Sequence, residues 1–181
     1  SVTAGGQFGR SCAISGEYII VGRQEASDVV TAGGAVYILK RFGNTFVNDT
    51  KLVSPSPVAW DQFGISVDID GDYAIVGAEG ADSAFVYHRS GGTWSQQAKF
   101  TSGTSSTRFG WSVSISGEYA VVGAYLDDTG GSDRGKVYIY KRSGTTWTEQ
   151  TTIQASDAQN SDRFGRAVNI DGDTIVIGAY Y

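Results

Sequence analysis

One sequence template recurs four times along this chain of 181 residues. Each copy opens with a Phe-Gly pair, has Ile six residues after that Phe, and has Gly at eight and again at fourteen residues after it. The four copies open at Phe8, Phe63, Phe109 and Phe164. Self-similarity at a period of roughly 50 residues is typical of arrays in which each repeat is one small packing unit. We therefore expect four related units along the chain.

Each unit has the pattern of four short strands. Residues 112–115 alternate polar and apolar, as a strand with one buried face does. A Ser-Gly or Asp-Gly pair follows, which favours a tight hairpin. The next run, 119–122, is continuously apolar and predicts a strand buried on both faces. A third strand is expected at 137–142 and a polar, solvent-facing fourth strand at 146–155.

Repeated four-stranded units predict an all-β fold, a β-propeller of four-stranded antiparallel blades. The expected blades span 8–62, 63–108 and 109–163, and 164–181 is a half-blade, so about three and a half blades are present. No window has the apolar period of a long helix, and no apolar stretch is long enough to predict a membrane span. An open propeller leaves two blade faces exposed. We expect further blades to cover them, either from a longer chain or from a second copy.

The charge and the reactive residues of the chain argue against two classes of function, nucleic-acid binding and catalysis. The formal net charge is −5 and the basic residues are scattered, which argues against a nucleic-acid partner. Cys12 takes the template position of Val67 and is expected to be a small buried residue, while His88 is expected to be exposed and inert. The sequence has no Ser-His-Asp, Cys-His or metal-ligand constellation, so we predict that the chain is not an enzyme.

The template Phe-Gly-x-Ser-Val-x-Ile-x-Gly-(Asp/Glu)-Tyr-x-(Ile/Val)-Val-Gly-Ala resembles the FG-GAP repeat. Three copies end in Gly-Ala, at Gly77, Gly123 and Gly178, whereas the first ends in Gly22-Arg23 and none carries the Pro. FG-GAP repeats build the propeller of integrin α-subunits and of many secreted or surface proteins. The resemblance therefore implies a propeller that serves as an extracellular or cell-surface interaction or adhesion module.

One family feature is missing from the sequence. Many integrin-type repeats carry a calcium loop of the Asp-x-(Asp/Asn)-x-Asp-Gly kind between their first and second strands. Here that connection is only a Ser-Gly-Glu or Asp-Gly-Asp turn, at 15–17, 70–72, 116–118 and 171–173. Calcium takes six to eight oxygen ligands, and so short a turn cannot supply them. We therefore expect no bound metal and no cofactor.

Ligand contacts are expected where the loops that enter the first strand meet those that join the second and third strands. These loops differ in length between blades while the template stays constant, which is how function is usually added to a scaffold. Three aromatic residues there are candidates for stacking on a sugar or a peptide aromatic: Trp60, Trp111 and Tyr125. Three acidic residues of the third-blade loop are candidates for an acidic binding surface: Asp127, Asp128 and Asp133.

Three functions stay open at this point. The leading one is a non-catalytic extracellular protein-interaction or adhesion module. The others are a carbohydrate-binding propeller that uses the three aromatic residues, and a structural building block of an extracellular assembly. The expected partner is accordingly a protein or a glycan at the loop face. Asn48-Asp49-Thr50 is a sequon for N-glycosylation on an expected outer strand, which is compatible with secretion.

Overall fold

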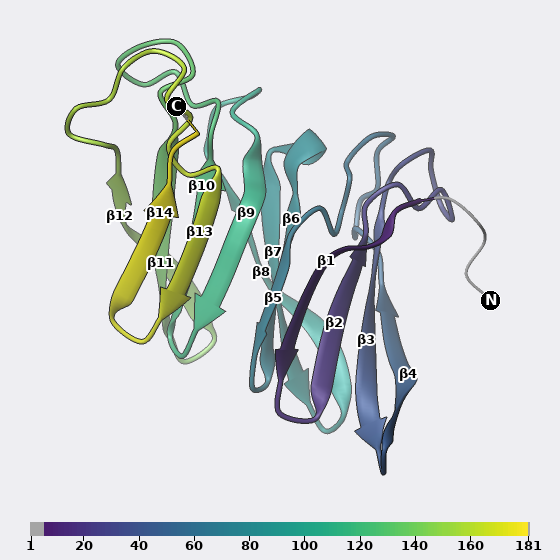
Figure 1. Ribbon diagram of the computed structural model, residues 1–181. Coiled ribbons are helices and arrows are strands. Elements are labelled where there is room, and N and C mark those ends of the chain that lie inside the picture. Colours follow the sequence, from purple (N-terminus) through teal and green to yellow (C-terminus); the bar gives the residue numbers. More distant parts are fainter. Residues whose placement is uncertain (1–5, 181) are drawn as a thin grey trace.

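The computed structural model describes residues 6–180, which form four antiparallel sheets standing side by side (Figure 1). Three sheets have four strands and the last has two, so the chain is an all-β propeller of about three and a half blades. Strands follow chain order across each complete sheet. The fold predicted from the repeat is confirmed. In the described part of the chain, no helix is long and apolar enough to cross a membrane.

Each sheet lies within one repeat of the template. The first contains β1 (Phe8–Ser15), β2 (Tyr18–Arg23), β3 (Ala35–Phe42) and β4 (Thr45–Leu52). The second contains β5 (Val67–Asp70), β6 (Tyr73–Ala78), the 3-10 turn η1 (Glu79–Ala81), β7 (Ser83–Ser90) and β8 (Thr93–Thr101). The third contains β9 (Phe109–Ser116), β10 (Tyr119–Ala124), β11 (Lys136–Ser143) and β12 (Thr146–Ile153). The half-blade contains β13 (Ala167–Asp171) and β14 (Thr174–Gly178).

The connections divide the molecule into two ends. Two-residue turns join the first strand of each blade to the second, and Gly takes the first central position with φ of +56° at Gly71 and +57° at Gly117. A type II′ turn needs Gly there. These turns lie together at the bottom of Figure 1, which we call the hairpin end. The longer loops within and between blades lie at the top, which we call the loop end.

Burial follows the order of strands in each of the three complete blades. The second strand is buried on both faces, as its unbroken apolar run predicts, and Ala120, Val121 and Val122 of β10 are fully buried. The fourth strands β4 and β12 are mostly exposed, because only part of each reaches the neighbouring blade. The Phe of the template closes the core, since Phe63 and Phe109 are fully buried.

Template glycines let the backbones of neighbouring blades touch. A Cβ atom on Gly77, at the end of β6, would overlap the carbonyl oxygen of Gly110, at the start of β9. Gly22 and Gly123 meet the next Phe-Gly carbonyl in the same way. Gly110 also has φ of +89°, which side-chain-bearing residues rarely adopt. The Phe-Gly and Gly-Ala ends of the repeat are therefore the two halves of one contact between blades.

Hydrogen bonds repeat at the same interfaces. Ser66 Oγ donates to the carbonyl oxygen of Gly110 at 2.8 Å, and Ser112 Oγ donates to that of Gly165 at 2.7 Å. At the hairpin end, the N–H of Gly117 donates to Oδ2 of Asp70 at 2.7 Å. These bonds satisfy polar groups that would otherwise be desolvated between two sheets. They fix the rotation of each blade relative to the next.

A cluster of three side chains recurs near the hairpin end of both complete interfaces. Tyr18 of the first blade lies beneath Arg89 of the second, with the guanidinium carbon 4.3 Å from the ring centroid, and Trp94 contacts it edge-on at 6.1 Å. Tyr73 of the second blade meets Arg142 of the third at 4.2 Å. Trp147 completes the second cluster at 6.3 Å from Tyr73. We call this Tyr-Arg-Trp arrangement the interblade clasp.

Two expectations about single residues are wrong. Cys12 is exposed, although Val67 and Val113 at the same template position are only 8% and 7% exposed. The reason is that this position faces the preceding blade, and nothing in the described residues precedes the first blade. His88 is half-buried, because its ring stacks on Tyr73 with the centroids 4.6 Å apart.

Candidate functional site

The loop end of the third blade and the half-blade carries an aromatic and cationic cluster. Trp111 lies near the start of β9 and Tyr125 directly follows β10, so the antiparallel pairing of these strands brings the two side chains together. Their ring centroids are 5.0 Å apart in an edge-to-face arrangement. This geometry is the favourable one for a pair of aromatic quadrupoles. Two of the three predicted aromatic residues therefore form one surface.

Arg166 joins this pair from the half-blade. Its guanidinium carbon lies 4.8 Å from the ring centroid of Trp111 and 4.9 Å from that of Tyr125. The ring of Tyr180 is also 4.9 Å from it. A guanidinium at such distances is held by cation–π attraction while its N–H groups stay available for hydrogen bonds. The cluster thus combines stacking surfaces with a positioned cation.

Sequence reasoning missed two members of the cluster. Arg166 takes the template position of Trp111, and Tyr180 takes that of Tyr125, because both pairs sit at equal distances from their Phe-Gly motifs. The repeat itself therefore contained the signal that these four side chains lie on adjacent blades at the same height. What it could not supply was the rotamer that brings the guanidinium over the rings.

Trp60 lies in a different part of the loop end. It is 61% exposed, and φ of +70° places its backbone in the left-handed region. The backbone N–H of Trp60 donates to the carbonyl oxygen of Thr31 at 2.9 Å, which ties it to the long β2–β3 loop of the first blade. Within residues 6–180 its ring contacts no other aromatic ring. The structure does not bring Trp60 together with Trp111 and Tyr125.

Asp127 supports the third-blade loop from the inside. It is only 2% exposed, and its carboxylate accepts hydrogen bonds from the N–H of Thr129 at 2.9 Å and from the Tyr138 hydroxyl at 3.1 Å. Lys136 lies 3.4 Å away. Burial by itself raises the pKa of Asp127, but the bonds from Thr129, the charge of Lys136 and the bond from Tyr138 outweigh it, so the pKa is lowered.

The two other acidic residues shape the outer part of this loop. The backbone N–H of Asp133 donates to Oδ1 of Asp128 at 2.8 Å, and Asp133 has φ of +51°. Asp128 is exposed, and it lies beside a cavity of about 380 Å³ between this loop and residues 104–107. Across residues 6–180, no group of three or more His, Cys, Asp or Glu side chains is placed to hold a metal ion.

The sequon lies far from this cluster. Asn48 is exposed on the fourth strand of the first blade, where it pairs with Leu39 in the β3–β4 register. Its side chain is therefore accessible at the outer surface. The structure leaves room for a glycan there without disturbing the loop end.

Sheet order, interblade contacts and a loop-end cluster together define a β-propeller repeat protein. The family model of the FG-GAP repeat matches residues 2–39, 46–92, 94–140 and 147–181, and the chain belongs to this family. A solved structure with a similar fold is Sqt1 of Saccharomyces cerevisiae, with a TM-score of 0.59 and 9% sequence identity. The likeness covers 87% of this chain but only 38% of that one, and it concerns the fold alone. No curated protein matches the sequence significantly.

Proposed function

We propose that this chain is a non-catalytic protein-interaction module of an extracellular or cell-surface protein, and that it binds its partner at the loop end. Propellers of FG-GAP repeats are generally non-catalytic, which supports this class. The observation that carries the proposal is the cluster of Trp111, Tyr125, Arg166 and Tyr180. Aromatic residues and Arg are the types enriched at the energetic centres of protein interfaces.

The cluster has the properties that such a centre needs. Tyr180 is 56% exposed, and the other three side chains are half-buried, so they are held in place yet reachable. A partner can stack an aromatic or peptide plane on the rings and offer a carboxylate to the guanidinium of Arg166. The variable loops of the neighbouring blades surround this centre and can add selectivity.

A binding screen tests the proposal. The chain is immobilised and presented with a panel of purified extracellular proteins, and each hit is measured again with Arg166→Ala and with Tyr125→Ser. We expect affinity to fall about tenfold or more for these variants, the loss typical of a central interface residue. Phe42→Ser is the matched control, because Phe42 is 77% exposed at the hairpin end. Equal loss with the control, or no loss with the loop-end variants, contradicts the proposal.

A carbohydrate-binding function is the second candidate, favoured by the Trp111–Tyr125 pair. Aromatic faces stack on the apolar faces of sugar rings, and the solvent-exposed Trp60 offers a further ring. A glycan array separates the two functions. Glycan binding that disappears with Trp111→Ala, together with no protein hit, favours the carbohydrate-binding function. Protein binding without glycan binding favours the interaction module.

A further inference from the structure

A cavity opens between the first and second blades, and we call it the side cavity. Its volume is about 550 Å³, and it is lined by the β4–β5 connection, by η1 and by strands β7 and β8. The buried ring of Phe85 and the exposed side chain of Lys99 both line it, with Nζ of Lys99 5.5 Å from the ring centroid. The side cavity thus combines an apolar surface with an exposed cation.

The first blade has the same pair of an aromatic residue and a lysine, and a carboxylate completes it. Tyr37 and Lys51 face each other across β3 and β4, as Phe85 and Lys99 do across β7 and β8. Nζ of Lys51 lies 5.8 Å from the ring centroid of Tyr37 and 2.7 Å from Oδ2 of Asp28. The hydrogen bond from Lys51 is the main cause that lowers the pKa of Asp28, so this place favours an ionised carboxylate.

The third blade builds the same group of three with a lysine from another position. Nζ of Lys136 lies 5.7 Å from the ring centroid of Tyr138 and 3.4 Å from Oδ1 of Asp127. In both blades the carboxylate comes from the loop that joins the second and third strands, at 24–34 in the first blade and at 125–135 in the third. A long loop therefore supplies the anion in each case.

The second blade has no such loop. Its connection between the second and third strands spans only 79–82, seven residues fewer, and is mostly the 3-10 turn η1 at the loop end (Figure 1). Both acidic residues of this short connection bond to the β8–β9 connection instead. Among the described residues no carboxylate pairs with Lys99. Phe85 and Lys99 therefore have the aromatic and the cationic member of the group but lack the anionic one.

Asp61 gives the side cavity a second polar side chain. Its Oδ2 accepts the N–H of Val58 at 2.7 Å, while within residues 6–180 its Oδ1 accepts no hydrogen bond. This carboxylate repels a free anion that enters the cavity. A peptide segment differs, because it brings backbone N–H donors for Asp61 together with an acidic side chain for Lys99. The side cavity therefore favours an acidic peptide over an inorganic anion.

We propose that the side cavity binds an acidic segment of a partner protein. An aspartate or glutamate of that segment pairs with Lys99 beside the ring of Phe85, as Asp28 pairs with Lys51 in the first blade. The backbone of the segment donates to Asp61. This inference goes beyond the proposed function, because the side cavity shares no residue with the cluster of aromatic residues and Arg166.

A peptide titration tests the proposal. The probe is the blocked peptide of residues 26–30, acetyl-Ala-Ser-Asp-Val-Val-amide, which contains Asp28. It is added to the ¹⁵N-labelled folded chain and followed by amide chemical shifts. We expect saturable shifts at Ala81 and Lys99, which line the side cavity. Affinity should fall about fivefold when the chain carries Lys99→Ala or the peptide carries Asp28→Asn, the effect of losing an exposed ion pair. Equal binding by the Lys99→Ala chain overturns the proposal.

Two control variants separate this site from other surfaces. Lys40→Ala is the matched control, because Lys40 is exposed and lies 5.7 Å from the ring centroid of Tyr18 at the hairpin end. Arg166→Ala tests independence from the loop-end cluster. We expect both variants to bind the peptide like the unaltered chain. Loss of peptide binding with Arg166→Ala but not with Lys99→Ala overturns this inference and leaves the proposed function standing.

Charge reversal gives a second readout. We expect Lys99→Glu to abolish binding of the peptide and to create binding of a peptide that carries Asp28→Lys, because the charges are then complementary again. Sodium sulfate at matched ionic strength should not shift the same amides, and equal shifts with sulfate overturn the choice of a peptide. A dimer of the unaltered chain that Lys99→Glu dissociates also overturns the proposal, because a second copy would then occupy the side cavity.

Discussion

At the scale of single residues, several residues of the template make contacts between neighbouring blades. The glycine near the end of the second strand has room for hydrogen alone, because the Phe-Gly carbonyl of the next blade lies against it. The half-blade offers the natural comparison. At Gly178 a Cβ atom would meet only Ala167, whose Cβ lies at an ordinary 3.5 Å and whose carbonyl oxygen lies at 3.8 Å. The same template position therefore has no room for a side chain at Gly77 but does have room for one at Gly178.

We expect Gly77→Ala to destabilise the fold by about 3 kcal/mol or more, since the new methyl group forces two backbones apart. Gly178→Ala is the matched control and should change the free energy of unfolding by about 0.5 kcal/mol or less. Urea denaturation followed by tryptophan fluorescence measures both. Similar losses for the two variants would show that the glycine serves the strand itself and not the interface.

Asp127 should make stability depend on pH. Its pKa in the folded chain is below the ordinary 3.8, so the carboxylate stabilises the fold above that value and the contribution is lost as pH falls through the folded pKa. We expect Asp127→Asn to lower the thermal midpoint by about 3–6 °C at pH 7. The difference from the unaltered chain should shrink below about pH 4. A constant difference from pH 7 to pH 3 would contradict this role.

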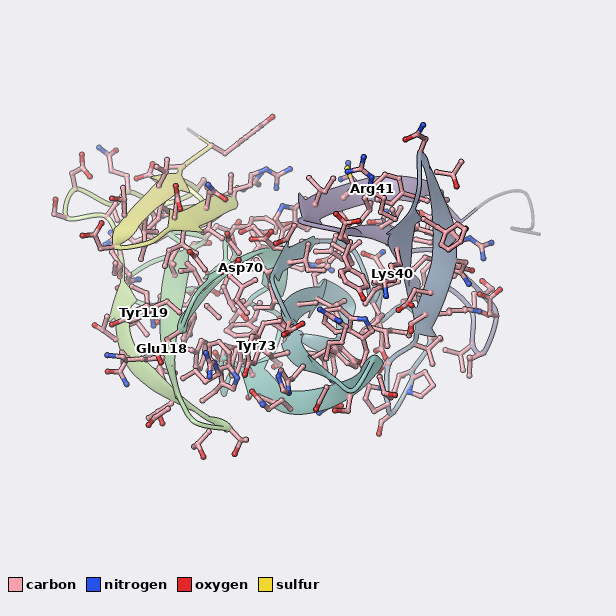
Figure 2. All side chains as sticks on the ribbon, turned by 90° about the horizontal axis from the view of Figure 1, so that it is seen from below. Lys40, Arg41, Asp70, Tyr73, Glu118 and Tyr119 are labelled. Atoms are coloured by element: carbon pink, nitrogen blue, oxygen red, sulfur yellow. The ribbon has the colours of Figure 1, made fainter. Side chains whose placement is uncertain are left out.

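At the scale of elements, the hairpins β7–β8 and β11–β12 each contact the blade before them. The arginine and tryptophan that begin and end its turn reach across to the tyrosine of the preceding blade and form the interblade clasp. Figure 2 shows Tyr73, the centre of the second clasp, towards the middle of the hairpin end. Trp147 Nε1 adds a hydrogen bond to Oε1 of Gln97 at 2.7 Å. The fourth strands β8 and β12 therefore help to hold neighbouring blades together, although much of each strand faces solvent.

We expect Arg142→Ala to destabilise the chain by about 1 kcal/mol, the typical value of a partly exposed cation–π contact. Arg41→Ala is the matched control. Both guanidinium groups donate to the carbonyl of a turn glycine, Gly144 and Gly43, at 3.1 Å, but Arg41 is exposed. Comparing the thermal unfolding of the two variants measures how much the interblade clasp contributes to stability. An equal loss for Arg41→Ala would assign the effect to the turn.

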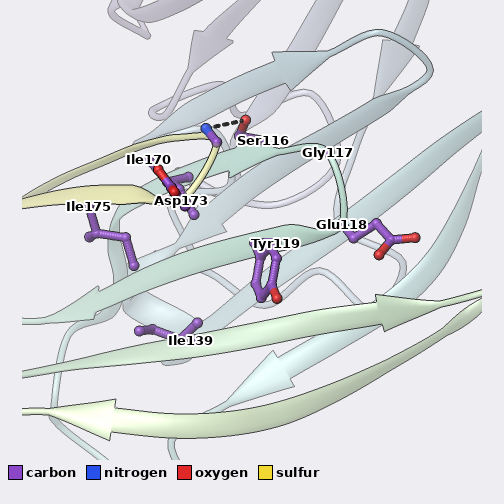
Figure 3. Close-up of a pocket in the computed structure, with 9 residues that line it drawn as sticks. Ser116, Gly117, Glu118, Tyr119, Ile139, Ile170, Asp173 and Ile175 are labelled. Atoms are coloured by element: carbon purple, nitrogen blue, oxygen red, sulfur yellow. Dashed lines mark hydrogen bonds between the residues drawn. The ribbon is translucent and has the colours of Figure 1, made fainter.

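At the scale of the whole molecule, the described chain presents two unlike faces. The first-blade face exposes Phe8, Cys12 and Ile14, and Ile14 is 64% exposed although Ile69 and Ile115 are buried. The other face carries the cavity of about 510 Å³ beside β14, which Tyr119, Ile139 and Ile175 line (Figure 3). Position in the array, and not residue type, decides which copy of the template is buried.

Thiol chemistry can measure this effect of position. We expect Cys12 to react with a disulfide reagent in the folded chain almost as fast as in the unfolded chain, because its side chain is exposed. In a Cys12→Ser background, Val67→Cys should react far more slowly, since Val67 is 8% exposed at the same template position. Equal rates would contradict the open first-blade face. The reaction is followed by absorbance at neutral pH with and without denaturant.

The loop-end site could be predicted in part. Trp111 and Tyr125 were identified from their place relative to the template, and they do contact each other. The sequence offered no means of separating them from Trp60, because Trp60 also lies close to a Phe-Gly pair, three residues before Phe63. The burial of Asp127 could not be predicted from the sequence either, since an acidic residue in a Gly-rich loop is usually exposed to solvent. Only packing against Tyr138 and Lys136 turns it inward.

The sequence alone determined the fold of this protein, because a template with strand periods, turn glycines and a fixed repeat admits few arrangements besides a propeller. It also determined the strand order and the burial of the second strand in each complete blade. The tertiary structure decided which copies of the template are covered, how Arg166 lies over the aromatic pair, and where the cavity beside β14 opens. These features depend on which blade packs against which. A copy of the template has the same local sequence whether or not a neighbouring blade covers it, so the sequence could not predict them.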